Sequence, residues 1–180
     1  MNERCPMDSI TATAANSEDS LGMLPTIEIR ALLAGDDSTA FRTLNEEWIS
    51  RYFVLEAKDR ETLGDPERTI LRKGGHIFMV YADGEPVGCV ALISMGDGVY
   101  ELSKMAVSSR LRGLGIGRKL LEYTISRARL IGARALFLGS STKLKNAVHL
   151  YESVGFRHVP PEKLPPMHYA RADVFMEMPL

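Results

Sequence analysis

The segment from Met105 to Leu121 constrains this chain more than any other part of it. It reads MAVSSRLRGLGIGRKLL, so a strand-like pattern runs into alternating glycines and then into an amphipathic helix. The glycines at 113, 115 and 117 leave backbone N–H groups unobstructed at a helix start, where the first N–H donors have no partner within the helix. The helix dipole adds partial positive charge there. Basic side chains surround the same point: Arg110, Arg112, Arg118 and Lys119. This combination predicts a binding site for a phosphate or pyrophosphate.

Other uses of a glycine-rich turn fit the segment less well. A plain turn into a helix does not need three alternating glycines, because each one costs helix stability. The mononucleotide pattern G-x-x-x-x-G-K-[ST] is absent. The dinucleotide pattern G-x-G-x-x-G also fails, because Arg118 or Leu120 stands where its third glycine belongs. The spacing that is present is R-x-x-G-x-G, from Arg112 to Gly117.

The rest of the chain predicts one mixed α/β domain. Apolar alternation and short apolar runs predict strands at 26–30, 76–81, 87–95, 99–107, 133–139, 156–159 and 173–178. Helical spacing predicts a helix after the candidate caps at 36–38, a second from Asp65-Pro66 to Gly74, a third from the glycine loop to Gly132, and a fourth over 143–154. Tight turns at 83–84 and 96–98 make the middle of the chain an antiparallel meander. Residues 1–23 are polar and are expected to form a flexible tail.

Charge and apolar content exclude several classes of function. The 180 residues include 22 basic and 23 acidic side chains, without the basic surplus typical of nucleic-acid-binding proteins. No apolar run approaches the roughly 18 residues that span a bilayer, and the N-terminus lacks the apolar core of a secretory signal. Two cysteines, Cys5 and Cys89, form neither a disulfide framework nor a metal-ligand pattern. We therefore expect a cytoplasmic protein with no metal and no nucleic-acid or membrane partner.

The sequence resembles the GNAT superfamily of N-acyltransferases in two segments that occur in the family's order. The first is the loop from Arg112 to Gly117, and the second is the helix NAVHLYESVGF from Asn146 to Phe156. The order of strands and helices over residues 26–178 is also similar to that of the family. The resemblance implies one GNAT domain over residues 24–180, with a mixed, centrally splayed β-sheet flanked by helices. It also implies acetyl-CoA as co-substrate and transfer of its acetyl group to an amine.

The resemblance assigns coenzyme-binding residues to both segments. The pyrophosphate would bind the backbone N–H groups of the glycine loop: Arg112, Gly113, Leu114, Gly115, Ile116, Gly117 and Arg118. Met105, Ala106 and Val107, at the end of their strand, would meet the pantetheine arm. Asn146 would contact the coenzyme from the other side.

Two side chains are candidates for the acid–base chemistry. An amine acceptor is mostly protonated at neutral pH, so a base must take its proton. Glu101 has the spacing, four residues before Met105, of the catalytic glutamate in the histone-acetylating branch of the superfamily. Strand alternation would put Glu101 on one face with Met105 and Val107. Tyr151 matches the family's tyrosine that protonates the leaving thiolate. The simpler alternatives are a solvent-facing strand residue for Glu101 and a half-buried core residue for Tyr151.

The acceptor is expected between the first two helices and the loop before the last strand. Trp48 and Tyr52 would line one side of this site, although both also fit the core face of a helix. Arg171 would hold a carboxylate bidentately on the other side, which suits an amino-acid-like acceptor; the alternative is an ordinary surface arginine. Exposed strands near the C-terminus are compatible with a homodimer.

Three functions stay open from the sequence. The first is an N-acetyltransferase for a small or amino-acid-like amine. The second is an acetyltransferase for protein lysines or N-termini, with a peptide amine as its acceptor. The third is a non-catalytic acetyl-CoA sensor, which the presence of both Glu101 and Tyr151 disfavours.

Overall fold

The computed structural model describes residues 24–164 and 170–180. The segment expected to be a flexible tail, residues 1–23, lies outside the described residues. So do residues 165–169, which belong to the loop expected beside the acceptor. Within the described ranges, no helix has both the length and the apolar character needed to cross a bilayer.

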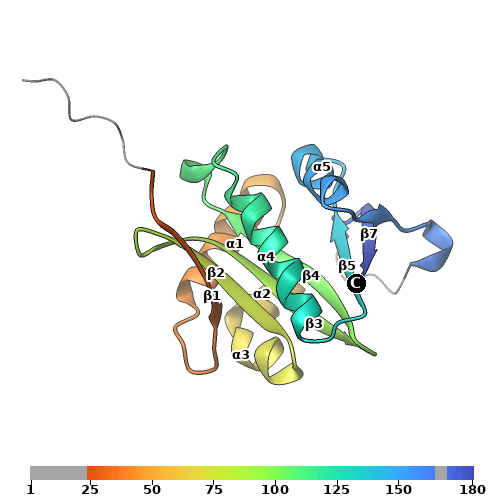
Figure 1. Cartoon of the computed structure of the whole chain (residues 1–180), viewed down its shortest axis with the longest axis horizontal. Helices are drawn as coiled ribbons and strands as arrows, with labels where there is room; N and C mark the ends of the chain where they lie inside the picture. The colour runs from red at the N-terminus through yellow and green to blue at the C-terminus, as the bar shows by residue number, and fades with distance from the viewer. Residues whose placement is uncertain (1–23, 165–169) are drawn as a thin grey trace, which may run out of the picture.

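A seven-stranded sheet forms the centre of the described chain (Figure 1). Its order is β1-β2-β3-β4-β5-β7-β6. The strands are β1 (Ile27–Leu32), β2 (His76–Ala82), β3 (Glu85–Gly96), β4 (Val99–Val107), β5 (Ala135–Ser140), β6 (Arg157–His158) and β7 (Val174–Pro179). Every neighbouring pair is antiparallel except β4 and β5, which are parallel. The mixed α/β fold and the β2–β3–β4 meander predicted from the sequence are thereby confirmed.

Helices cover both faces of the sheet over two apolar cores (Figure 1). One core lies under α1 (Thr39–Tyr52) and α2 (Ala57–Gly64) and includes Phe41, Ile49 and Ile77. The opposite core lies under α4 (Ile116–Leu130) and includes Leu120 and Leu136. Helix α5 (Lys145–Ser153) adds partly buried apolar residues to this second core. The remaining turns are α3 (Pro66–Thr69) and the 3-10 turns at Leu71–Lys73, Ser109–Leu111 and Pro161–Lys163.

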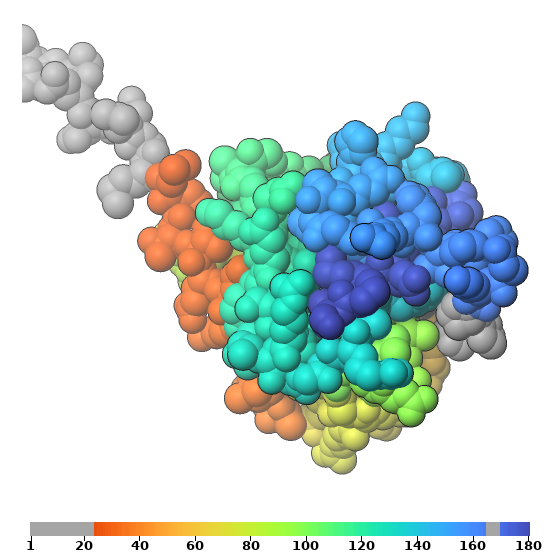
Figure 2. Space-filling view, turned by 45° about the vertical axis from the view of Figure 1, so that its right-hand side comes forward, coloured from red at the N-terminus to blue at the C-terminus, as the bar shows by residue number. Residues whose placement is uncertain are grey.

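The C-terminal strand packs beside the segment that follows α4. Figure 2 shows the dark blue end of the chain lying against the teal residues of this region. The Leu180 N–H donates to the Arg134 carbonyl at 2.9 Å, and Met178 is buried in the same core as Ala133. The strand that ends the chain therefore completes the core under α4.

Strands β4 and β5 are paired over only a short stretch. Their parallel register runs from Val99 opposite Ala135 to Glu101 opposite Phe137. Beyond this point β4 keeps its pairing with β3, and β5 keeps its pairing with β7 as far as Ser140. The sheet is therefore splayed at its centre, as the family resemblance implied.

A bulge in β4 interrupts the side-chain alternation that the sequence predicts for this strand. Lys104 has φ of 53°, and the β3–β4 register shifts between Cys89 and Ala91. One extra residue in a strand reverses the inside–outside order of everything after it. Glu101 pairs with Ile93, which packs with the α1 core, whereas Met105 and Val107 pack with the α4 core. The prediction that Glu101 shares a face with Met105 and Val107 was wrong for this reason.

The second predicted helix also differs from the structure. Asp65 caps a helix as expected, because its side chain accepts a hydrogen bond from the Arg68 N–H, but that helix (α3) lasts only from Pro66 to Thr69. The longer helix here is α2, which the sequence did not reveal. Its N-terminal end carries a reciprocal cap between Glu56 and Asp59, and its buried residues are only Asp59, Thr62 and Leu63. An apolar stripe that narrow gives little helical periodicity.

Candidate active site

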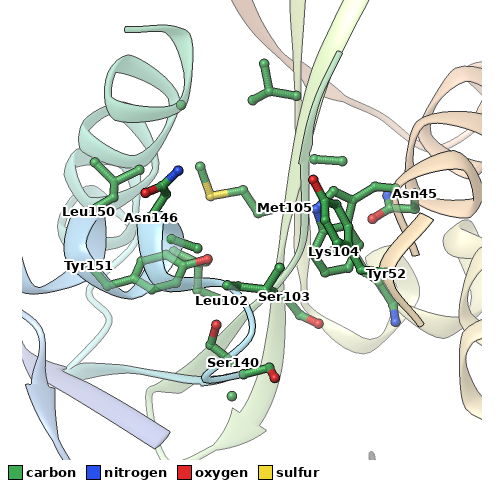
Figure 3. A pocket seen from close by; sticks show the side chains of 18 of the residues that line it. Asn45, Tyr52, Leu102, Ser103, Lys104, Met105, Ser140, Asn146, Leu150 and Tyr151 are labelled. Atoms are coloured by element: carbon green, nitrogen blue, oxygen red, sulfur yellow. The ribbon is translucent and has the colours of Figure 1, made fainter. Parts of the chain in front are cut away.

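A cavity of about 720 Å³ opens where β4 and β5 separate (Figure 3). Residues of α1 form one wall, residues of α5 form the other, and β4 runs between them. The cavity brings together the side chains expected at the coenzyme, the reaction centre and the acceptor. Leu114 is the exception among these, since its side chain is exposed and does not line the cavity.

The glycine loop closes one end of the cavity at the start of α4. Gly113 and Gly115 have φ of 81° and 72°, the left-handed conformation that glycine adopts without strain. Gly115 is the N-cap of α4, and no side chain caps this helix end. The first turn of α4 therefore presents backbone N–H groups and the positive end of its dipole to an anion.

Two arginines flank this loop and are held by neighbouring side chains. Arg112 donates to the Tyr52 hydroxyl at 3.3 Å, which connects the loop to the end of α1. Arg118 donates to the Ser153 hydroxyl at 2.6 Å and pairs with Glu122 at 3.3 Å. Both arginines line the cavity, so they add basic side chains beside the backbone donors.

The middle of the cavity is lined by β4 and α5. Figure 3 shows Asn146, Leu150 and Tyr151 projecting from α5 toward β4, with the Met105 thioether between the two elements. Because β5 no longer pairs with β4 beyond Glu101, the β4 edge that contains Met105 faces the cavity. An extended ligand arm can lie along such an edge and bond to its backbone groups.

Glu101 lies at the point where the strands separate. It is the last β4 residue paired with β5, and its side chain lines the cavity. The bulge at Lys104 puts Glu101 on the α1 face of the sheet, whereas Met105 lies on the α4 face. A carboxylate and a ligand arm would therefore approach the fork from opposite faces of the sheet.

Tyr151 lines the cavity from α5. Its ring packs edge-on against Phe156, with ring centroids 5.9 Å apart. Burial raises the pKa of the Tyr151 phenol to about 12. The hydroxyl is therefore protonated at neutral pH and can act as a proton donor.

Aromatic and basic side chains line the cavity on the α1 side. Trp48 packs against Tyr52 and Phe53, with ring centroids 6.3 Å and 6.1 Å away. Two cations lie beside the Phe53 ring: Lys143 Nζ is 5.6 Å from its centroid and the Arg171 guanidinium carbon is 5.9 Å away. Phe53, Lys143 and Arg171 come from three separate segments, which meet at this end of the cavity.

Arg171 also belongs to a buried ionic cluster that the sequence did not reveal. It donates to both carboxylate oxygens of Asp59, at 2.7 Å and 2.9 Å, and Lys104 Nζ donates to the same carboxylate at 2.7 Å. Burial would raise the pKa of Asp59, but the hydrogen bonds from Arg171 and Lys104 outweigh it and lower this pKa to about 2. The expected bidentate geometry of Arg171 is thus directed at a carboxylate of the protein itself.

The remaining chemistry-bearing residues fit structural roles. Cys89 is buried on β3, where burial raises the pKa of its thiol to about 12, as suits a small core residue. In the described part of the chain, no three His, Cys, Asp or Glu side chains are grouped as metal ligands.

The chain as a whole is similar to a known family of proteins. The sequence profile of the acetyltransferase (GNAT) family matches residues 40–156. The chain is 29% identical to the uncharacterized N-acetyltransferase YjgM of Escherichia coli, over 73% of this chain and 82% of that protein. It is 40% identical to the N-acetylaspartate synthetase of Xenopus tropicalis, over 58% of this chain but only 40% of that protein.

Solved structures share the fold at lower identity. A GNAT-family acetyltransferase of Staphylococcus aureus has a TM-score of 0.77 at 22% identity, covering 86% of this chain and 99% of its own. The acetyltransferase yncA of Salmonella typhimurium, solved with its cofactor acetyl-CoA, has a TM-score of 0.63 at 20% identity, covering 85% of this chain and 93% of its own. With a family profile that spans most of the domain and a matching fold, the chain belongs to the GNAT family of acetyltransferases.

Proposed function

We propose that this protein transfers the acetyl group of acetyl-CoA to the amine of a small, amino-acid-like acceptor by direct attack on the thioester. The observation that carries the proposal is the cavity at the β4–β5 fork. It joins an uncapped helix N-terminus at one end to Glu101 and Tyr151 at the fork. A pure binding module would not need a carboxylate and a protonated phenol at that point.

The lining residues fit acetyl-CoA. The backbone N–H groups at the start of α4, with Arg112 and Arg118 beside them, suit its pyrophosphate. The unpaired edge of β4 beyond Glu101 suits the amides of a pantetheine arm. The solved yncA structure, which has its cofactor acetyl-CoA bound, shows that a fold of this type can hold it.

Glu101 and Tyr151 supply the two proton transfers that the reaction needs. As the amine nitrogen bonds to the thioester carbon, Glu101 accepts the proton of the amine, directly or through a water. The carbon–sulfur bond then breaks, and Tyr151 gives its proton to the leaving thiolate. No covalent enzyme intermediate is required, in keeping with the buried position of Cys89.

The charges that line the cavity favour an acceptor that carries carboxylates. Among the described residues of the lining, Lys104, Lys143 and Arg171 lie on its α1 side and Glu101 is the acidic one. Lys104 and Arg171 share the buried carboxylate of Asp59, which does not line the cavity. The relatives named N-acetylaspartate synthetase make, by their name, an acetylated amino acid with two carboxylates. We therefore propose an amino acid with an acidic side chain as the acceptor class.

Removal of the Tyr151 hydroxyl tests its role as the proton donor. Tyr151→Phe should lower kcat by about 100-fold, the usual contribution of a general acid, and should change the KM for acetyl-CoA by less than about twofold. Tyr123→Phe is the matched control, because Tyr123, on α4, packs against Phe78 of β2 and does not line the cavity. Equal kcat in the two variants would contradict the assignment.

Removal of the Glu101 carboxylate tests its role as the base. Glu101→Gln should lower kcat/KM by about 100-fold near pH 7, and the deficit should shrink toward pH 9 as more of the amine acceptor loses its proton in solution. The measurement is the ratio of wild-type to variant kcat/KM across this pH range. A ratio that does not change with pH would indicate that Glu101 does not take the proton.

A methyl group at Gly117 tests the pyrophosphate site. A Cβ there would lie 3.7 Å from Leu150 and 3.9 Å from Met105, which are ordinary contacts, so Gly117→Ala should fold normally. It should weaken acetyl-CoA binding by about 10-fold or more, because the methyl group occupies the space beside the helix N-terminus. Gly64→Ala, with nothing within 4 Å of its Cβ, is the control. Unchanged affinity in calorimetry would place the coenzyme elsewhere.

A further inference from the structure

Asp59 is a buried carboxylate that binds two cations of the cavity without lining the cavity itself. Its side chain is 0% exposed. One carboxylate oxygen accepts from Lys104 Nζ at 2.7 Å and from Arg171 at 2.9 Å. The other accepts from Arg171 at 2.7 Å and from the Glu56 backbone N–H at 2.9 Å. Each oxygen therefore accepts two hydrogen bonds, which is what a buried carboxylate needs.

The cluster joins three segments that are distant in the sequence. Asp59 lies on α2, Lys104 on the β4 bulge 45 residues later, and Arg171 on the segment that enters β7, 112 residues later. Lys104 has φ of 53°, a conformation that costs free energy for any residue with a side chain and persists only where contacts hold it. The ion pair with Asp59, in which the Lys104 side chain is 3% exposed, is such a contact.

Both partners of Asp59 line the cavity on the side proposed for the acceptor. Lys and Arg side chains have many rotamers, so an unrestrained pair would lose conformational entropy on meeting an anion. Asp59 fixes both side chains before the acceptor arrives. Two cations share this one carboxylate, and Glu56 adds a weaker contact to Arg171 at 3.4 Å nearer the surface. The positions of the two side chains at the wall are therefore preorganised, and the Arg171 side chain is the more exposed of the two, at 15% against 3% for Lys104.

We propose that Asp59 is a positioning residue for acceptor recognition: it holds Lys104 and Arg171 at the cavity wall and so sets the preference for an acceptor with a side-chain carboxylate. This inference rests on the proposed function. Asp59 acts through the two cations and not on the reacting atoms, so its loss should affect acceptor binding more than turnover.

The test compares two acceptors that differ by one charge, L-aspartate and L-asparagine, in steady-state assays with acetyl-CoA. The wild-type enzyme should prefer aspartate. Asp59→Asn should raise the KM for aspartate about 10-fold or more while kcat, the KM for asparagine and the KM for acetyl-CoA stay within about threefold. Asp65→Asn, which alters an exposed ion pair with Arg68, is the matched control and should behave as wild type.

The other possible outcomes distinguish a failure of this inference from a failure of the proposed function. A purely structural role would reduce the active fraction, so that kcat would fall equally for both acceptors with KM unchanged, and this would overturn the inference. If Asp59→Asn does not fold, Arg171→Met should show the same loss of preference for aspartate, and an unchanged preference would overturn it. Wild-type turnover of both acceptors without preference would also overturn it, while leaving the N-acetyltransferase intact. No turnover with any amine would overturn the proposed function itself.

Discussion

The end of backbone pairing between β4 and β5 determines where this protein has a site. Parallel strands normally continue side by side, because each buried N–H and C=O needs a partner. Here the register stops after Glu101 and Phe137, and each strand keeps only its outer neighbour. The divergence creates a cavity through the centre of the sheet, lined by α1, α5 and the glycine loop at the start of α4.

The bulge at Lys104 puts different side chains on the two faces of the sheet at this fork. Without it, Glu101 and Met105 would lie on one face, and the proposed base and the proposed coenzyme arm would compete for the same space. With it, Glu101 faces the α1 side and Met105 the α4 side. The same bulge directs Lys104 to the buried Asp59, so the backbone irregularity, the ionic cluster and the separation of the two proposed ligand sites depend on one another.

Features that depend on local sequence were predictable. The glycine loop, its arginines and the meander follow from residues that are neighbours in the chain, and the structure has them where the patterns indicate. Features that depend on residues distant in the sequence were not predictable. Alternation along β4 assumes a regular strand, so the bulge reversed the expected face of Glu101. Helix α2 has an N-terminal cap and the ion pairs of Asp59, whose partners are 45 and 112 residues away, and no local pattern shows them.

The most direct test of this account is to follow thiol release from acetyl-CoA by the wild-type protein, with the acylated product identified by mass spectrometry, in the presence and absence of amino-acid acceptors. The account predicts release that requires a primary amine and equals the amount of N-acetylated product. Tight binding of acetyl-CoA with no thiol release from any small amine or lysine peptide would contradict it, and would identify the cavity as a binding site without catalysis.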